Sequence, residues 1–118
     1  MKEKSDGNDF VCGIELFNAG RYFESHEVLE KVWLQAEGEE KTVLQGLIQA
    51  AAALLHLERG NLVGARSLMR KSRVNLVSDS RLSIGLSLVG FSRALEMCIS
   101  AVENGDPSMA RPVLRLIA

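Results

Sequence analysis

The chain has 118 residues, of which 47% are hydrophobic and 25% charged, and its formal net charge is −1. These values indicate one globular domain built around a single core. With almost no net charge and only 5% aromatic residues, the chain lacks both the basic surface and the stacking side chains of a nucleic-acid binder. We therefore expect neither nucleic acid nor a membrane surface as a partner.

The cysteines and the chain start suggest where the protein resides. Cys12 and Cys98 stand far apart, without CxxC spacing, and each falls where a helix would bury it. Two core thiols fit a reducing cytoplasm, which is the location we expect. The first seven residues are polar and lack the apolar segment of a signal peptide. The apolar run from Leu47 to Leu57 is too short to span a bilayer.

Turn residues divide the chain into helices. After a disordered segment over residues 1–7, we expect a single helical domain over residues 8–118. Five helices are predicted at residues 9–19, 22–36, 40–59, 62–77 and 83–103, with a short sixth from about residue 107. No segment alternates with period two, so no strand is expected. The predicted fold class is all-α, with five to six helices.

A repeated turn predicts how these helices pair. Gly20, Gly60 and Gly105 each end a helix and are each followed, five positions later, by a small residue. This is the pattern of a tight antiparallel hairpin, similar to the turn of a tetratricopeptide repeat. The helix at 40–59 is apolar around most of its circumference, which is typical of a buried central helix. We expect the hairpins to pack around it.

The helix at 22–36 carries oddly placed polar residues. At about 100° per residue, its apolar arc includes Ser25 and Leu29, and His26 and Glu30 follow at the edge of that arc. Beyond Glu30 the helix becomes apolar again at Phe23 and Leu34. Because burying such polar groups is costly unless they are paired or bind a ligand, His26 and Glu30 mark a candidate site.

The central helix offers a matching polar strip of Gln45, Gln49 and His56. If the two strips face each other, His26, Glu30 and His56 converge as two imidazoles and one carboxylate. Such a set can hold Zn²⁺, Fe²⁺ or Mn²⁺ and leave coordination positions open. Gln49, Trp33 and Gln45 would support this site. Glu27 is a poorer supporting candidate because it points elsewhere on the wheel.

Two other interpretations of the same residues stay open. His26 and Glu30 can form a purely structural pair one helical turn apart, or they can perform acid–base chemistry without a metal. The zinc-protease motif HExxH is absent because position 30 is Glu. No phosphate loop or nucleophile elbow is present either, so whether the protein is an enzyme is left undecided.

The chain resembles the prokaryotic family called domain of unknown function 309, from about Phe17 to Leu76. Its signatures are similar to the segments 17–33, 44–49 and 56–61, and its hallmark HxxxExxW falls on His26, Glu30 and Trp33. The resemblance implies an all-α domain and a suggested metal-binding role for the hallmark. The residues after about Val77 carry no motif of this family.

The leading hypothesis is a cytoplasmic helical protein with a metal or small-molecule site formed by His26, Glu30 and His56. The alternative is a tetratricopeptide-like protein-binding or scaffolding module, in which His26 and Glu30 are only a structural pair. The apolar tail at residues 112–117 would dock on its own chain or join two chains. We expect a homodimer.

Overall fold

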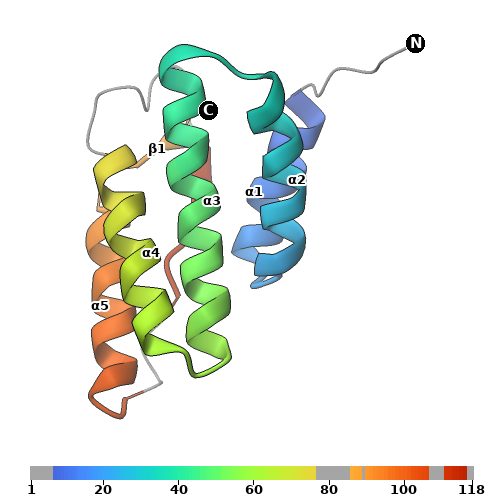
Figure 1. Ribbon diagram of the computed structural model, residues 1–118. Coiled ribbons are helices and arrows are strands. Elements are labelled where there is room, and N and C mark those ends of the chain that lie inside the picture. Colours follow the sequence, from blue (N-terminus) through green and yellow to red (C-terminus); the bar gives the residue numbers. More distant parts are fainter. Residues whose placement is uncertain (1–6, 77–85, 89, 107–110, 117–118) are drawn as a thin grey trace.

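The computed structural model describes residues 7–76, 86–88, 90–106 and 111–116 (Figure 1). Disorder was expected over residues 1–7; residues 1–6 lie outside the described residues, whereas Gly7 is helical. The described elements are α1 (Gly7–Asn18), α2 (Tyr22–Gln35), α3 (Gly38–Glu58), α4 (Leu62–Asn75), β1 (Leu86–Ser87), α5 (Phe91–Glu103) and β2 (Arg115–Leu116).

The predicted all-α fold is confirmed. Figure 1 shows α3 at the centre, with α2 on one side and α4 on the other, while α1 pairs with α2 and α5 packs on α4. The central place of α3 follows from its sequence, because apolar residues surround it. Its buried residues are Val43, Leu44, Gly46, Leu47, Ile48, Ala50, Ala51, Ala53, Leu54 and Leu57.

The three predicted glycine turns have the same geometry. Gly20, Gly60 and Gly105 have φ of +82°, +78° and +82°. In each turn the glycine N–H bonds the carbonyl three residues back, and the next N–H bonds the carbonyl five residues back. This is the Schellman ending, which reverses the chain after a helix and favours glycine because of the positive φ. The hairpins predicted at Gly20 and Gly60 are therefore confirmed, whereas the small residue expected after Gly105, Ala110, lies outside the described residues.

A buried contact locks α1 against α2. The hydroxyl of Ser25, which is fully buried, donates a hydrogen bond to the carbonyl of Gly13 at 2.8 Å. A Cβ on Gly13 would lie only 2.6 Å from Cδ2 of Leu29. The two helices therefore approach closely because a glycine and a serine meet at their interface.

The same contact recurs between α3 and α4. The buried hydroxyl of Ser72 donates to the carbonyl of Gly46 at 2.7 Å. A Cβ on Gly46 would lie 2.7 Å from Cδ2 of Leu76 and 3.1 Å from Cβ of Asn75. We call these two Gly–Ser–Leu contacts the hairpin locks.

The fifth helix begins later than predicted. It starts at Phe91 rather than at residue 83, and Gly90 before it has φ +78°, a conformation outside the helical region. Leu86 and Ser87 instead form strand β1, which pairs antiparallel with β2. The apolar periodicity was read correctly only from Phe91 onward, because Gly90 interrupts the helix.

The C-terminal segment docks on its own chain as an extended strap, which we define as residues 111–116. Within it Pro112 and Leu114 are buried. The side chain of Asn18 donates to the Leu114 carbonyl at 2.8 Å and accepts from the Leu114 N–H at 2.7 Å. The expectation of no strand was therefore wrong. The strap contains β2, where a sixth helix was expected, and residues 107–110 lie outside the described part.

The homodimer stays a prediction. The mass of the protein measured by light scattering tests it.

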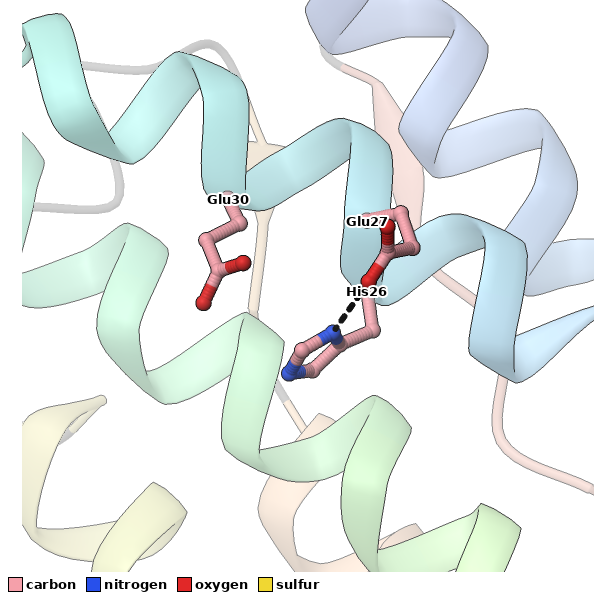
Figure 2. A group of neighbouring side chains, drawn as sticks. All are labelled: His26, Glu27 and Glu30. Atoms are coloured by element: carbon pink, nitrogen blue, oxygen red, sulfur yellow. Dashed lines mark ion pairs between the residues drawn. The ribbon is translucent and has the colours of Figure 1, made fainter.

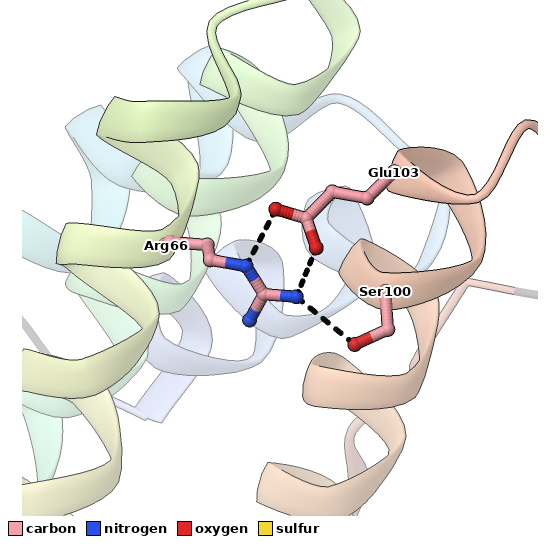
Figure 3. A network of polar contacts seen from close by, with 3 residues as sticks. All are labelled: Arg66, Ser100 and Glu103. Carbon is pink, nitrogen blue, oxygen red and sulfur yellow. Dashed lines mark hydrogen bonds and ion pairs between the residues drawn. The ribbon is translucent and has the colours of Figure 1, made fainter.

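Polar contacts hold α5 to α4 (Figure 3). Nε of Arg66 donates to Glu103 at 2.7 Å, and Nη2 pairs with the other carboxylate oxygen of Glu103 and donates to Ser100 at 3.1 Å. This hydrogen bonding raises the pKa of the Arg66 guanidinium and lowers the pKa of the Glu103 carboxyl below its usual value. A second ion pair joins Arg73 to Glu96 at 3.4 Å.

Two sequence-based expectations on location can be compared with the structure. Both cysteines are free, but only Cys98 is buried, whereas Cys12 lies exposed on α1. The expectation that both thiols lie in the core was therefore wrong for Cys12. Within the described residues, no helix combines the length and hydropathy needed to cross a bilayer.

Candidate functional site

Three side chains of α2 gather at its boundary with α3. One potential metal-binding atom from each of His26, Glu27 and Glu30 lies within 4.8 Å of those of the other two. Figure 2 shows the imidazole and the Glu30 carboxylate reaching from α2 toward α3. His26 is half-buried, and the two glutamates are exposed. In the part of the chain that the structure describes, this is the only such group of three or more His, Cys, Asp or Glu side chains.

The imidazole of His26 has an unsatisfied nitrogen. Nδ1 is shielded from solvent and has no hydrogen-bond partner among the described residues, although 29% of the side chain as a whole is exposed. Its nearest charged neighbour is Oε2 of Glu27 at 3.9 Å, which is too long for a hydrogen bond. A buried nitrogen without a partner destabilises the fold by about 1–3 kcal/mol. This position therefore gains stability from a bound cation or from a proton shared with a carboxylate.

The hairpin lock fixes the direction of His26. Because Ser25 and Leu29 face α1 and the core, the next residue after Ser25 must turn about 100° along the helix surface, toward the boundary with α3. The predicted second apolar flank is not covered by another helix, since Phe23 is 54% exposed and Leu34 is 67% exposed. The site is therefore at the rim of the α2–α3 interface and open to solvent on one side.

The structure does not bring His56 to this group. Nδ1 of His56 accepts a hydrogen bond from Nδ2 of Asn61 at 2.9 Å. The orientation of that amide is set because its oxygen caps α4 by accepting from the Gly64 N–H at 3.0 Å. The expectation that His56 faces His26 was therefore wrong: His56 belongs to the α3–α4 turn.

The predicted supporting amides also lie elsewhere. Oε1 of Gln49 accepts from Nδ2 of Asn75 at 2.8 Å, so Gln49 joins α3 to α4 rather than to α2. Gln45 and Trp33 both line an open hollow of about 260 Å³ near the α2–α3 turn, where the Lys41 ammonium lies 4.3 Å from the centre of the Trp33 ring.

Sequence reasoning undervalued Glu27. A helical wheel treats each side chain as a radial vector, and on that wheel Glu27 points about 100° away from His26. A glutamate is long enough to swing back over its neighbour, as it does here. The signal available in the sequence was the direct adjacency of the histidine and the acid.

The arrangement supplies one imidazole and two carboxylates from a single helix. These are ligand types that Zn²⁺, Fe²⁺ and Mn²⁺ accept. Metal–ligand bonds are about 2.1 Å long, so the two exposed carboxylates would rotate inward to reach a shared ion. The alternative hypothesis, a structural pair of His26 and Glu30, also needs revision. The carboxylate at ion-pair distance from Nδ1 of His26 is that of Glu27, at 3.9 Å.

Comparisons with known proteins identify relatives of this chain. The model of a family described as domain of unknown function (DUF309) matches residues 10–68. YpuF of Bacillus subtilis (strain 168), described as an uncharacterised protein, is 39% identical over 90 residues, which are 75% of this chain and 51% of that protein. An uncharacterised protein of Aquifex aeolicus (strain VF5) is 29% identical over 92 residues, 77% of this chain and 28% of that protein. The chain thus spans about half or less of the length of these relatives.

A solved structure is similar over most of the fold. The crystal structure of a conserved hypothetical protein from Thermus thermophilus has a TM-score of 0.67 and 35% sequence identity. The similarity covers 84% of this chain and 100% of that one. The helical arrangement is therefore shared with this bacterial protein.

Proposed function

This chain belongs to the DUF309 family, and we propose that it binds a divalent transition-metal ion through His26, Glu27 and Glu30. The observation that carries the proposal is the buried, unpartnered Nδ1 of His26 beside two carboxylates. Neighbouring carboxylates favour a cation at this nitrogen. The proposal replaces His56 of the sequence-based site with Glu27.

The chemistry of such a site follows from its ligand count. Three protein ligands on one side of Zn²⁺, Fe²⁺ or Mn²⁺ leave the remaining positions for water or for a small molecule. A bound Zn²⁺ would supply a water that ionises near neutral pH and would then act as a nucleophile. The exposed carboxylates leave the site accessible to a ligand from solvent. The protein is thus proposed as a metal-binding domain with an open coordination face.

The two histidines of the chain provide a matched experiment. Protein stripped with a chelator is titrated with Co²⁺ and with Zn²⁺, following Co²⁺ absorption and calorimetric heat. We expect one ion per chain in the wild type, loss of binding in His26→Ala, and binding weakened about tenfold or more in Glu30→Gln. His56→Ala should bind like the wild type, because His56 is held by Asn61.

The circular dichroism of each variant controls for folding. Equal loss of binding in His26→Ala and His56→Ala, with helical signal retained, would show that the ion is held at a different place. A wild type that binds neither ion at millimolar concentration would contradict the proposal.

The cytoplasmic location stays a prediction, supported by the two free thiols.

The scaffolding alternative has its own supporting observation. Phe23 and Leu34 are large apolar side chains exposed on α2, beside the candidate site. A partner helix covering them would bury apolar area that the isolated chain leaves in water. In that case a specific partner should still bind His26→Ala but should fail to bind Phe23→Ser, which separates the two proposals.

A further inference from the structure

A hollow at the α2–α3 turn contains binding groups that the fold itself does not use. Its volume is about 260 Å³, below the 300–1,000 Å³ range of pockets for drug-sized ligands. Its lining comprises one aromatic ring, one ammonium, one hydroxyl and two amides. The residues are Trp33, Gly38, Lys41, Thr42, Gln45 and Asn75.

The hollow contains one positive charge, the ammonium of Lys41. Lys41 is half-buried, and its ammonium lies over the Trp33 ring at 4.3 Å. Within the described ranges, no carboxylate lies within ion-pair distance of Lys41. A cation–π contact of this kind contributes about 0.5–1 kcal/mol and fixes the position of the ammonium without neutralising it. The hollow therefore presents a positioned positive charge to solvent.

The polar groups around Lys41 have spare hydrogen-bonding capacity. The side-chain amide of Gln45 is half-buried and makes no hydrogen bond within the part of the chain that is described. Asn75 uses its amide nitrogen on Gln49. Thr42 has only a long contact, 3.5 Å, to the Gly38 carbonyl. An ammonium, an amide N–H and a hydroxyl in one small hollow suit a ligand that is an anionic acceptor.

We propose that this hollow binds a small oxyanion, a carboxylate or a phosphate group, with Lys41 and Gln45 as the principal donors. The hollow adjoins the cation group along α2. His26, Glu30 and Trp33 fall within about 60° of one another around the helix, and Trp33 is about 4.5 Å further along the axis than Glu30. One ligand can therefore span both places, but the hollow itself consists of residues outside the cation group.

The single tryptophan reports on the hollow directly. Chelator-treated, metal-free protein is titrated separately with inorganic phosphate and with acetate, and Trp33 emission is recorded against sodium chloride at matched ionic strength. We expect a saturable change in emission with phosphate or with acetate and none with chloride. The comparison of the two anions tells which of the two groups the hollow prefers.

Variants then locate the binding by calorimetry. Lys41→Met should weaken the preferred anion about tenfold or more, the loss expected for one charge-assisted hydrogen bond. Gln45→Leu should weaken it several-fold. Lys31→Met, which removes an exposed charge elsewhere on α2, is the matched control and should bind like the wild type.

Three results would overturn the inference. One is an emission change that chloride reproduces, and another is equal weakening by Lys41→Met and Lys31→Met. The third is anion binding that appears only after metal is added and disappears in His26→Ala, which would place the anion on the metal. Loss of metal binding in the earlier titration leaves this test unaffected, because it uses metal-free protein.

Discussion

The two hairpins, α1–α2 and α3–α4, share one lock but differ in what they carry beside it. Ser25 and Leu29 in the first correspond to Ser72 and Leu76 in the second, each pair bearing on a glycine of the preceding helix. The residue after the serine is His26 in the first hairpin and Arg73 in the second. Arg73 forms an ion pair with Glu96 of α5, whereas His26 has an unsatisfied nitrogen.

The number of residues between the lock and the turn is the other difference between the hairpins. Gly13 precedes its turn glycine by 7 residues and Gly46 by 14, while Ser25 follows its turn by 5 residues and Ser72 by 12. The lock of the second hairpin thus lies seven residues further from its turn on each of the two helices. Seven residues make almost two complete turns, so the lock keeps its orientation. The lock thus recurs in both hairpins, and the group of His26, Glu27 and Glu30 lies beside the lock of the first one.

The largest effect is expected from filling the glycines of the locks. Gly46→Ala should lower the free energy of unfolding by about 1–3 kcal/mol, because its Cβ would overlap Leu76. Gly13→Ala should cost somewhat less, because the next neighbour of its Cβ, Cγ1 of Val28, lies at 3.6 Å, whereas at Gly46 the Cβ of Asn75 lies at 3.1 Å. Urea unfolding followed by circular dichroism measures both.

A double variant separates overlap from other causes. If the overlap with Leu76 is the reason, Gly46→Ala should cost less in a Leu76→Ala background than in the wild type. An alanine at Gly13 or Gly46 that leaves the stability unchanged would contradict the shared lock.

A smaller effect is expected from the serines. Ser25→Ala and Ser72→Ala each remove one buried hydrogen bond to a glycine carbonyl, so each should cost about 1 kcal/mol. The two costs should add, because the serines lie in different hairpins. Ser67→Ala on the exposed face of α4 is the control and should be neutral. Clearly unequal costs would mean that one hairpin relies less on its lock.

The smallest effect on stability is expected from the ion pair of Arg66 and Glu103, which joins the second hairpin to α5. Arg66 lowers the pKa of Glu103 in the folded state. The Glu103 carboxylate therefore stabilises the fold above the usual pKa of a glutamate, and this contribution is lost as the pH falls through the lowered pKa of Glu103 in the folded state. The difference in unfolding free energy between the wild type and Glu103→Gln should shrink between about pH 7 and about pH 3.

High salt and a substitution at another exposed glutamate provide the controls for this prediction. High salt should reduce the same difference, because exposed charges are screened. Glu15→Gln, an exposed change on α1, should show neither dependence. A difference between wild type and Glu103→Gln that is constant with pH would mean that the carboxylate charge does not hold α5.

Most of the helical fold was predictable because local signals determined it. Glycine turns, the cap at Asn61 and the apolar stripes placed the first four helices within about two residues. The start of α5 and the two strands were not predictable in this way. They depend on a pairing between Leu86 and Leu116, which are far apart in sequence and have no periodic pattern of their own.

The candidate site was only partly predictable for a similar reason. His26 and Glu30 lie on one helix, so their proximity followed from helical spacing. The position of His56 depended on how α3 is rotated between α2 and α4, and no wheel of a single helix contains that rotation. Asn61, five residues later, caps α4 with its side-chain oxygen, but the hydrogen bond from its amide nitrogen to His56 was not foreseen.

The strap has a consequence for how the helical bundle closes during synthesis. Asn18 and Leu114 are separated by 96 positions. At roughly 5–20 residues per second, a ribosome needs roughly 5–20 s to add that many residues. Throughout this interval the backbone groups of Leu114 that the Asn18 amide binds in the folded chain have not yet been synthesised, even after the hairpins have emerged and paired. A nascent chain whose hairpins have already paired is therefore open on the side of Asn18, and this side closes only once residues 111–116 have been translated.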